Sequence, residues 1–289
     1  MRLGGAIFKP YTNGYEWAER VREKGYRAAI CPLDATAPDA VIEEYKKAAA
    51  EADIVIGEVG VWNNPMHPDP RTRKEAVEFA KRQLLLAEKI EARCCVNITG
   101  TYNPDVWYGP HPENFTRKAF DEIVQTTREI IDAVGPVKTF YTFEPSAWLY
   151  PDSIETYLEL LDAVNRPALA VHWDPVNMMY SPRNYYQNAV FLTECIQRLG
   201  PYMKSCHLKD LYMDERFTLY VQERMSGDGI LDYPALIQEL DRLDPDMPAF
   251  VEHMETEEEY DRAGAYVISV MAQVAEESQI ENIRIDKGR

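Results

Sequence analysis

The sequence predicts a single (β/α)8 barrel, a TIM barrel, over residues 1–289. Short apolar runs alternate with longer amphipathic stretches along the whole chain, and each kind of segment occurs eight times. Such alternation indicates a parallel sheet with crossover helices, and eight repeats that close into a barrel are the common solution at this length. A doubly wound open sheet is the alternative, but the segment after the first strand, 9–15, lacks the GxGxxG sequence of a phosphate-binding loop.

The expected strands are short runs rich in apolar residues, which suits a parallel sheet buried on both faces. They lie at 3–8, 26–31, 53–59, 93–99, 138–144, 168–174, 202–208 and 248–253. The expected helices have an apolar face that repeats every three or four residues. They lie at 14–24, 38–51, 72–91, 115–133, 153–164, 185–199, 233–243 and 257–277. Thr72, Asp152 and Ser153 are candidate N-caps, because their side chains can accept hydrogen bonds from free backbone N–H groups.

The composition, with 46% hydrophobic and 27% charged residues, is typical of a globular protein with a sizeable core. The 31 basic and 48 acidic side chains give a formal net charge of −17, which would repel a phosphate backbone and argues against nucleic acid as a partner. The N-terminus lacks the apolar stretch of a signal peptide, and no segment approaches the ~20 apolar residues of a membrane span. We therefore expect a cytoplasmic protein with no membrane partner.

The five cysteines form an odd set without CxxC spacing. In a chain of this length, that pattern indicates reduced, buried thiols rather than disulfides or a zinc ribbon. A catalytic thiol would need a basic, accessible neighbourhood, and the sequence around these cysteines does not indicate one.

Metal-binding side chains stand at the ends of the last four expected strands, at Glu144, Asp174, His207 and Glu252. Singly, each could end a strand or pair with a basic residue. Together they should face one another, because the carboxyl ends of barrel strands converge on the active site. Neighbouring carboxylates are costly unless a cation compensates them. Three carboxylates and one imidazole suit one divalent ion, Mn²⁺ first and Mg²⁺ or Co²⁺ as alternatives, with positions left open for substrate oxygens.

Five segments carry a resemblance to a known family. They are FEPSAW around Glu144, HWDPVN around Asp174, CHLKD around His207, SGDGILDY at 226–233 and FVEHM around Glu252. The chain resembles the xylose-isomerase-like TIM-barrel superfamily, which includes tagatose 3-epimerase and other sugar isomerases and epimerases, inosose dehydratase and metal-dependent AP endonucleases. The resemblance spans essentially the whole chain, but it fixes the substrate poorly because members of one fold diverge mainly in their loops.

This resemblance implies that the four residues are the metal ligands, and that Glu144 and Glu252 also act as acid and base on opposite faces of the substrate. The chemistry is sound, because a cation that binds a carbonyl and a neighbouring hydroxyl makes the adjacent C–H proton removable by a carboxylate. Return of the proton from the other face epimerises the carbon, and return to the next carbon isomerises the sugar. Expulsion of a β-substituent would instead make the enzyme a lyase.

Three further residues are candidate substrate contacts beside this site. Asn177 stands where sugar 3-epimerases and AP endonucleases of the superfamily usually have His, and an amide is a poor metal ligand, which argues against a multi-zinc nuclease site. Arg224 lies in ERMSGDG, which resembles a family loop whose Arg contacts substrate oxygens, although a surface position on a turn is equally open. Lys209 should share the strand face of His207 and either contact substrate or pair with Asp210 or another acid.

Other candidates come from the strand ends and loops around the barrel mouth. Asn97 and Glu58 end the fourth and third strands and could bind substrate, although Glu58 could instead form an ion pair on the helix side. Trp62 and His111 lie in the loops that follow these strands and are further candidate substrate contacts, alongside His67 and the Trp107–Tyr108 pair. 

The two remaining histidines are expected to lie outside the direct contacts. His172 should face the barrel interior one layer below Asp174, as a second-layer or core residue. His253 follows Glu252 directly and should point away from the pocket. We assign no function to His253.

The leading hypothesis is a metal-dependent isomerase or epimerase that acts on a ketose or keto-sugar. The alternative is a lyase, either an inosose-type dehydratase or an enzyme that eliminates the aglycone from a 3-oxo-glycoside, including a C-glycoside. A non-catalytic partner subunit is a third reading, which the intact ligand set disfavours. A small carbohydrate is the expected ligand, and family resemblance implies an oligomer, with a homo-oligomer and a complex with a different chain both open.

Overall fold

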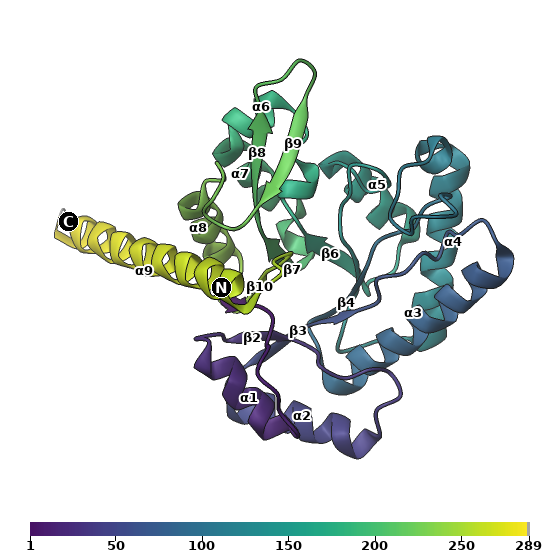
Figure 1. The fold of residues 1–289 in the computed structure, drawn as a ribbon, viewed down its shortest axis with the longest axis horizontal. Coiled ribbons are helices and arrows are strands. Elements are labelled where there is room, and N and C mark those ends of the chain that lie inside the picture. The colour runs from purple at the N-terminus through teal and green to yellow at the C-terminus, as the bar shows by residue number, and fades with distance from the viewer. Residues whose placement is uncertain (288–289) are drawn as a thin grey trace.

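The computed structural model describes residues 1–287 and contains a single-domain TIM barrel (Figure 1). Eight parallel strands form one sheet in the order β1-β10-β7-β6-β5-β4-β3-β2. Their bounds are β1 Arg2–Gly4, β2 Ala28–Ile30, β3 Val55–Gly60, β4 Cys94–Asn97, β5 Tyr141–Phe143, β6 Leu169–Trp173, β7 Met203–Leu208 and β10 Pro248–Val251. The predicted fold class is confirmed, and each barrel strand falls within or beside its expected range.

The barrel is nearly closed between its first two strands. The backbone N–H of Arg27 donates to the carbonyl of Leu3 over 2.9 Å, which joins the start of β2 to β1. On the other side, β1 pairs with β10 through the register Leu3 to Ala249. Closure leaves the sheet without a long exposed edge, which would otherwise invite pairing with another chain.

The helices cover the outside of the barrel, as Figure 1 shows. Those within residues 1–287 are α1 Gly14–Glu23, α2 Asp39–Glu51, α3 Pro70–Ile90, α4 Arg117–Val134, α5 Ile154–Val164, α6 Pro182–Tyr186, α7 Asn188–Leu199, α8 Tyr233–Leu243 and α9 Glu257–Lys287. Three short 3-10 turns accompany them, η1 Pro112–Phe115, η2 Val176–Met178 and η3 Gly200–Tyr202. The helix expected over 185–199 is divided, because Gln187 leaves the helical conformation between α6 and α7.

Two of the expected helix starts differ in how well the cap was predicted. Helix α3 begins earlier than expected: Asp69, not Thr72, is the N-cap, and its carboxylate accepts from the backbone N–H of Thr72. Pro70 at the first helical position favours this earlier start, since it has no N–H to satisfy. Helix α5 begins as predicted, with Ser153 as the N-cap in a capping box.

The expected loop at 209–232 contains structure that was not predicted. Strands β8 (Asp210–Asp214) and β9 (Tyr220–Arg224) pair antiparallel and form a ribbon that extends away from the barrel (Figure 1). Several large apolar side chains near its tip are exposed, and Phe217 is fully exposed. The ribbon follows β7, so its base lies beside His207 at the barrel mouth.

Glycines in the barrel wall make room for one aromatic ring inside. A Cβ atom on Gly4 would lie 2.4 Å from Cε1 of Phe250, and one on Gly57 would lie 2.5 Å from Cζ of the same ring. Phe250 is completely buried and therefore fills the lower part of the barrel interior. Above this apolar filling, the inward positions become polar, and the candidate site begins there.

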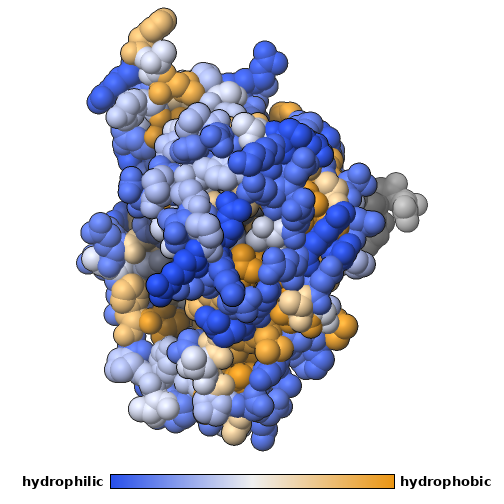
Figure 2. All heavy atoms as spheres, turned by 90° about the vertical axis from the view of Figure 1, so that its right-hand side faces the viewer, coloured by the Kyte–Doolittle hydropathy of each residue, from blue (hydrophilic) through white to orange (hydrophobic). Residues whose placement is uncertain are grey.

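The outer surface carries many polar side chains. The face in Figure 2 is mostly hydrophilic, with scattered apolar patches. No helix within the described part of the chain is long and apolar enough to cross a membrane. The five cysteines are free thiols. Four of them are buried, as predicted, whereas Cys31 is partly exposed.

Candidate metal centre

The four predicted ligands meet at the carboxyl ends of the strands. Glu144, Asp174, His207 and Glu252 follow or end β5, β6, β7 and β10, and one ligand atom from each lies within 4.8 Å of all the others. Nδ1 of His207 is 2.7 Å from Oε2 of Glu252 and 3.7 Å from Oε1 of Glu144. Strand alternation explains the convergence, because each side chain faces inward at a similar height.

Lys209 supplies a cation inside this acidic group. Its Nζ lies 2.7 Å from Oδ2 of Asp174 and 2.8 Å from Oε1 of Glu252, and its side chain is only 2% exposed. It also lies 3.4 Å from Oε2 of Glu223. Of the two roles expected for Lys209, the structure shows the pairing with acids. Two of these acids, Asp174 and Glu252, belong to the ligand set, and Glu223 comes from another part of the chain; none of them is the neighbouring Asp210.

Burial and charge act in opposite directions on these carboxyl groups. Complete burial raises the pKa of Asp174 to about 7, although Lys209 opposes this shift. Burial also disfavours ionised Glu252, but His207 and Lys209 outweigh it and lower the pKa of Glu252 well below its usual value. The same carboxylates raise the pKa of Lys209 well above normal, against its own desolvation. The site therefore holds more buried acid than its two basic side chains neutralise.

The donor atoms fit a divalent cation. Oδ2 of Asp174 and Nδ1 of His207 are buried and have no hydrogen-bond partner of acceptable geometry within the described residues, although charged neighbours lie close. The other carboxylate oxygen of Asp174 accepts from the backbone N–H of Val176 at 2.9 Å, which fixes the group. Three hard oxygen donors and one imidazole are the ligand types that Mn²⁺, Mg²⁺ and Co²⁺ accept.

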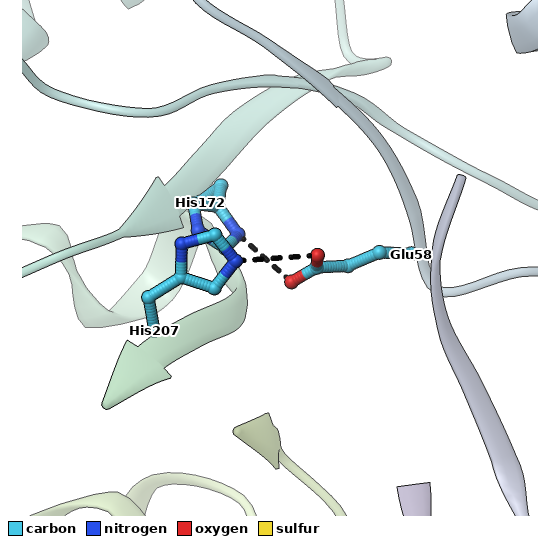
Figure 3. Close-up of side chains that lie close together, drawn as sticks. All are labelled: Glu58, His172 and His207. Carbon is cyan, nitrogen blue, oxygen red and sulfur yellow. Dashed lines mark ion pairs between the residues drawn. The ribbon is translucent and has the colours of Figure 1, made fainter. Parts of the chain in front are cut away.

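A second polar cluster lies beneath the ligand set. Glu58 on β3 contacts Nδ1 of His172 at 3.2 Å and Nε2 of His207 at 3.4 Å (Figure 3). Glu58 and His172 are fully buried, as expected for an inward His172. Burial disfavours ionised Glu58, but the two imidazoles outweigh it and lower its pKa to about 2. Glu58 thus lies in the barrel interior, and neither at the mouth nor on the helix side.

The two candidate asparagines occupy different places. Asn177 lies beside the ligand set, and its Nδ2 donates to Oε1 of Glu144 over 2.6 Å. Asn97 is fully buried, and its amide bonds to Asn63 and Tyr141. Cys94 of β4 faces the barrel interior, where its Sγ contacts Ser205. Asn97 lies three residues later and therefore faces the opposite side of the strand, toward the helices. In this structure Asn97 therefore supports the loop after β3 and is separated from the mouth.

Trp62 covers the ligand set from the side of β3. Its ring stacks on His207 with a centroid distance of 6.1 Å and an interplanar angle of 29°. Trp62 has φ +47°, and a Cβ on Gly60 would lie 2.3 Å from its Nε1. The absence of a side chain at Gly60 thus lets the indole fold back over the strand end. With 38% of its surface exposed, Trp62 forms a wall that a ligand can reach.

The ribbon brings Glu223 to the site in place of Arg224. Arg224 donates to Gln222 over 2.7 Å and packs over the ring of Tyr212, on the other side of β9. Glu223 contacts Lys209 and also His253, whose Nδ1 lies 3.0 Å away. Glu223 was not predicted, because the face of a strand cannot be assigned when the strand itself is not expected.

Two expectations about loop histidines are clarified by the structure. The expectation that His253 points away is wrong, because Nε2 of this residue lies 3.5 Å from Oε2 of Glu252. Its left-handed backbone, with φ +60°, ends the strand alternation and turns the ring back.

His111 caps the 3-10 turn η1 by accepting from the backbone N–H of Glu113, and packs against Tyr102.

Exposed aromatic side chains rim the loops after β4 and β5. Trp107 and Tyr108 pack edge to face at 5.1 Å and are both more than a third exposed, as is Trp148. His67 joins the loop after β3 to the loop after β4, with Nε2 3.2 Å from the carbonyl of Pro104. These loops follow strand ends, where the variable part of a barrel site is built.

The fold and the buried ligand set define a TIM barrel with a candidate metal site at the carboxyl ends of its strands. The chain belongs to the xylose isomerase-like TIM barrel family, whose sequence profile matches residues 12–270. The resemblance noted in the sequence is thereby confirmed. No curated protein matches the chain by sequence.

Solved structures share the fold at low sequence identity. A D-psicose 3-epimerase from Clostridium cellulolyticum H10, solved with D-tagatose, has 16% identity and a TM-score of 0.68, over 95% of this chain and 99% of that chain. A xylose isomerase-like protein from Mycobacterium smegmatis in complex with magnesium has 17% identity and a TM-score of 0.65, over 91% and 90% of the two chains. The probable 3-DHS dehydratase from Bacillus anthracis has 15% identity and a TM-score of 0.67, over 92% and 98%. These likenesses establish the fold.

Proposed function

We propose that this protein is a divalent-metal-dependent isomerase or epimerase that acts on a ketose or keto-sugar. The observation that carries the proposal is the buried set Glu144, Asp174, His207 and Glu252, in which two donor atoms find no hydrogen-bond partner of acceptable geometry among residues 1–287. A bound divalent ion would supply Lewis acidity and stabilise the negative charge that develops on the substrate oxygens. Mn²⁺ is our first choice of ion, with Mg²⁺ and Co²⁺ as alternatives.

In this proposal the two glutamates serve as acid and base. Glu144 and Glu252 come from β5 and β10, and two strands of the sheet, β6 and β7, lie between these. A substrate held across the cluster would therefore present a different face to each carboxylate. One carboxylate removes the proton next to the carbonyl, and the other returns a proton from the opposite side, which inverts the carbon.

Other side chains would shape the site around the substrate. Trp62 supplies an exposed aromatic face over His207, suited to the apolar face of a sugar ring. Asn177 would hold Glu144 in position and offer its amide to a hydroxyl group. Lys209 would favour the ionised forms of Asp174 and Glu252 before the metal binds. His111 and Arg224 would become contacts if the loop and ribbon that carry them rearranged around substrate, whereas Asn97, at the end of β4, would support the site only through Asn63 in the loop after β3.

A lyase of the same superfamily is the second candidate. The exposed aromatic residues Trp107, Tyr108 and Trp148 favour it, because they could hold an aglycone beside a sugar in the site. Proton removal next to a carbonyl would then be followed by loss of a β-substituent, either water from an inosose or the aglycone from a 3-oxo-glycoside. The resemblance to the fold of a probable dehydratase is compatible with this outcome.

We further propose a cytoplasmic protein whose ligand is a small carbohydrate. The acidic composition, with a net charge of −17, argues against nucleic acid as a partner. An oligomer is expected on family grounds, as either a homo-oligomer or a complex with a different chain.

Proton exchange in D₂O tests the proposal. The Mn²⁺-loaded protein would be incubated with ketoses, inososes and 3-oxo-glycosides. Deuterium next to a carbonyl, together with an epimer or isomer, would support the leading candidate. An ultraviolet-absorbing enone or a released phenol would select the lyase. No exchange with any compound would contradict both candidates.

A further inference from the structure

The buried cluster below the ligand set is unusual for a barrel interior. Glu58 is 1% exposed and His172 is fully buried, yet both are polar and lie above the apolar filling made by Phe250. A buried carboxylate is costly unless its charge is paired. Here one carboxylate pairs with two imidazoles, those of His172 and His207, contributed by different strands (Figure 3). An arrangement this specific points to a task beyond packing.

The two ring nitrogens of His207 face opposite directions. Nδ1 points to the ligand set, 2.7 Å from Glu252, whereas Nε2 points down to Oε2 of Glu58 at 3.4 Å. A histidine that binds a metal through one nitrogen must carry its proton on the other, and a carboxylate that accepts this proton fixes both the tautomer and the ring orientation.

We propose that Glu58 is a positioning residue that holds His207 as the Nε2–H tautomer, with the Nδ1 lone pair directed at the metal. This inference rests on the metal site of the proposed function. Glu58 touches neither substrate nor metal, and acts only through His207.

His172 and its neighbours keep the Glu58 carboxylate in place. Nδ1 of His172 lies 2.6 Å from Oγ of Ser205, as well as 3.2 Å from Glu58. Oγ of Ser205 in turn lies 3.1 Å from Sγ of Cys94. The sheet register supports this layer, since Glu58 is paired with Cys94 and His172 with Ser205. Rotation of Glu58 away from His207 would therefore break a contact within a packed interior.

A second metal ion bound by Glu58, His172 and His207 is the competing interpretation, because one ligand atom from each lies within 4.8 Å of the others. Two features disfavour it. The cluster offers three donors among the residues that the structure describes, and it shares His207 with the upper set. The imidazole of His207 would have to lose both ring protons to bridge two ions, whereas with one ion bound at Nδ1 it keeps a proton on Nε2, which lies 3.4 Å from Oε2 of Glu58.

Metal titration distinguishes these interpretations. EDTA-treated wild type, Glu58→Gln and a control variant would be titrated with Mn²⁺ in a calorimeter. Thr127→Val is the matched control, since Thr127 is a polar residue as deeply buried as Glu58. Its hydroxyl donates to the carbonyl of Ile123 within α4, away from the ligand set. We expect one equivalent of Mn²⁺ in all three proteins, with affinity about 10- to 100-fold weaker in Glu58→Gln and unchanged in the control.

The remaining outcomes are each decisive. An affinity for Glu58→Gln within twofold of wild type would overturn the positioning role and leave the proposed function intact. Two equivalents in wild type that fall to one in Glu58→Gln would establish the second-ion interpretation instead. No Mn²⁺ binding by wild type would overturn both this inference and the metal site on which it rests.

A measurement on the unaltered protein covers the case in which Glu58→Gln does not fold. The chain has five histidines, so ¹⁵N-labelled histidine in the Mg²⁺-loaded protein would give a readable set of ring signals. We expect the His207 signals of the Nε2–H tautomer. Signals of the Nδ1–H tautomer would overturn the proposal, because that proton would occupy the atom directed at the metal.

Discussion

The two ends of this barrel both carry charged residues, but they arrange them differently. At the amino ends of the strands, Arg2 pairs with Asp53 and Asp246 at 2.8 and 2.7 Å, and both acids are more than half exposed. At the carboxyl ends, Asp174 and Glu252 share Lys209 in a site where the lysine is only 2% exposed.

The two ends differ in how far water screens their charges. Exposed pairs are screened by water and contribute little to stability, so the amino end needs no further partner. Buried carboxylates are poorly screened from one another by water. Burial raises the pKa of Asp174 to about 7, which shows that its ionised form is disfavoured there. Only the carboxyl end therefore favours the binding of an additional cation.

The largest effect is expected from Glu252→Gln. The amide keeps the size of the side chain but can neither accept the substrate proton nor bind a divalent ion as well as a carboxylate. We expect kcat/KM for the proposed reaction to fall about 10²- to 10⁴-fold, with the fold retained. Circular dichroism would check the fold and an epimerisation assay the rate. Near-wild-type activity would remove Glu252 from the proposed mechanism.

Lys209→Met should affect stability strongly when no metal is present. Loss of the ammonium leaves Asp174 and Glu252 buried without their shared cation, which costs about 3–5 kcal/mol. Urea unfolding in EDTA measures this loss, and Mn²⁺ should restore more stability to this variant than to wild type.

Lys204→Met is the control, because it makes the same change at the other end of β7. Lys204 is half-buried and packs over Phe140 at 4.4 Å from the ring centroid. We expect a loss of about 1 kcal/mol or less. Equal stability of Lys209→Met and wild type in EDTA would show that protonation already neutralises the acids.

Trp62→Leu should have a moderate effect on substrate binding. The indole stacks over His207 and is 38% exposed, so it can contact substrate without holding the fold together. We expect KM to rise about 3- to 10-fold, in line with ~1 kcal/mol of aromatic contact, with kcat nearly unchanged. Steady-state kinetics would decide, and a fall confined to kcat would assign Trp62 to the chemical step instead.

The smallest effect is expected from Asp246→Asn at the amino end. Its partner Arg2 keeps a second acid, Asp53, and the pair is exposed. The free energy of unfolding should change by less than about 1 kcal/mol, and Mn²⁺ affinity should stay the same. A clear loss of metal affinity here would contradict the separation between the two ends.

The barrel could be predicted from the alternation of strands and helices along the chain, and the convergence of the four candidate ligands from their positions at strand ends. Glu144, Asp174, His207 and Glu252 end buried strands, and their positions hold even if a boundary moves by a residue or two. Asn97 shows where this reasoning fails. The residues of β4 that face inward are shifted by one position from those expected, so the side chain of Asn97 lies on the other face of the strand.

The polar residues around the ligands could not be predicted, because they come from distant parts of the sequence. Glu223 reaches Lys209 because β8 and β9 form a ribbon in what was expected to be a loop. Glu58 contacts His172 and His207 from across the barrel. Strand order and register bring these residues together, and neither can be read from one strand alone.

The most direct test of the metal site is a comparison of Asp174→Asn with Asp246→Asn. Each protein, and wild type, would be stripped with EDTA and titrated with Mn²⁺. The account predicts one equivalent for wild type and Asp246→Asn, and binding at least about 10-fold weaker for Asp174→Asn. No binding by wild type, or equal binding by all three proteins, would contradict it.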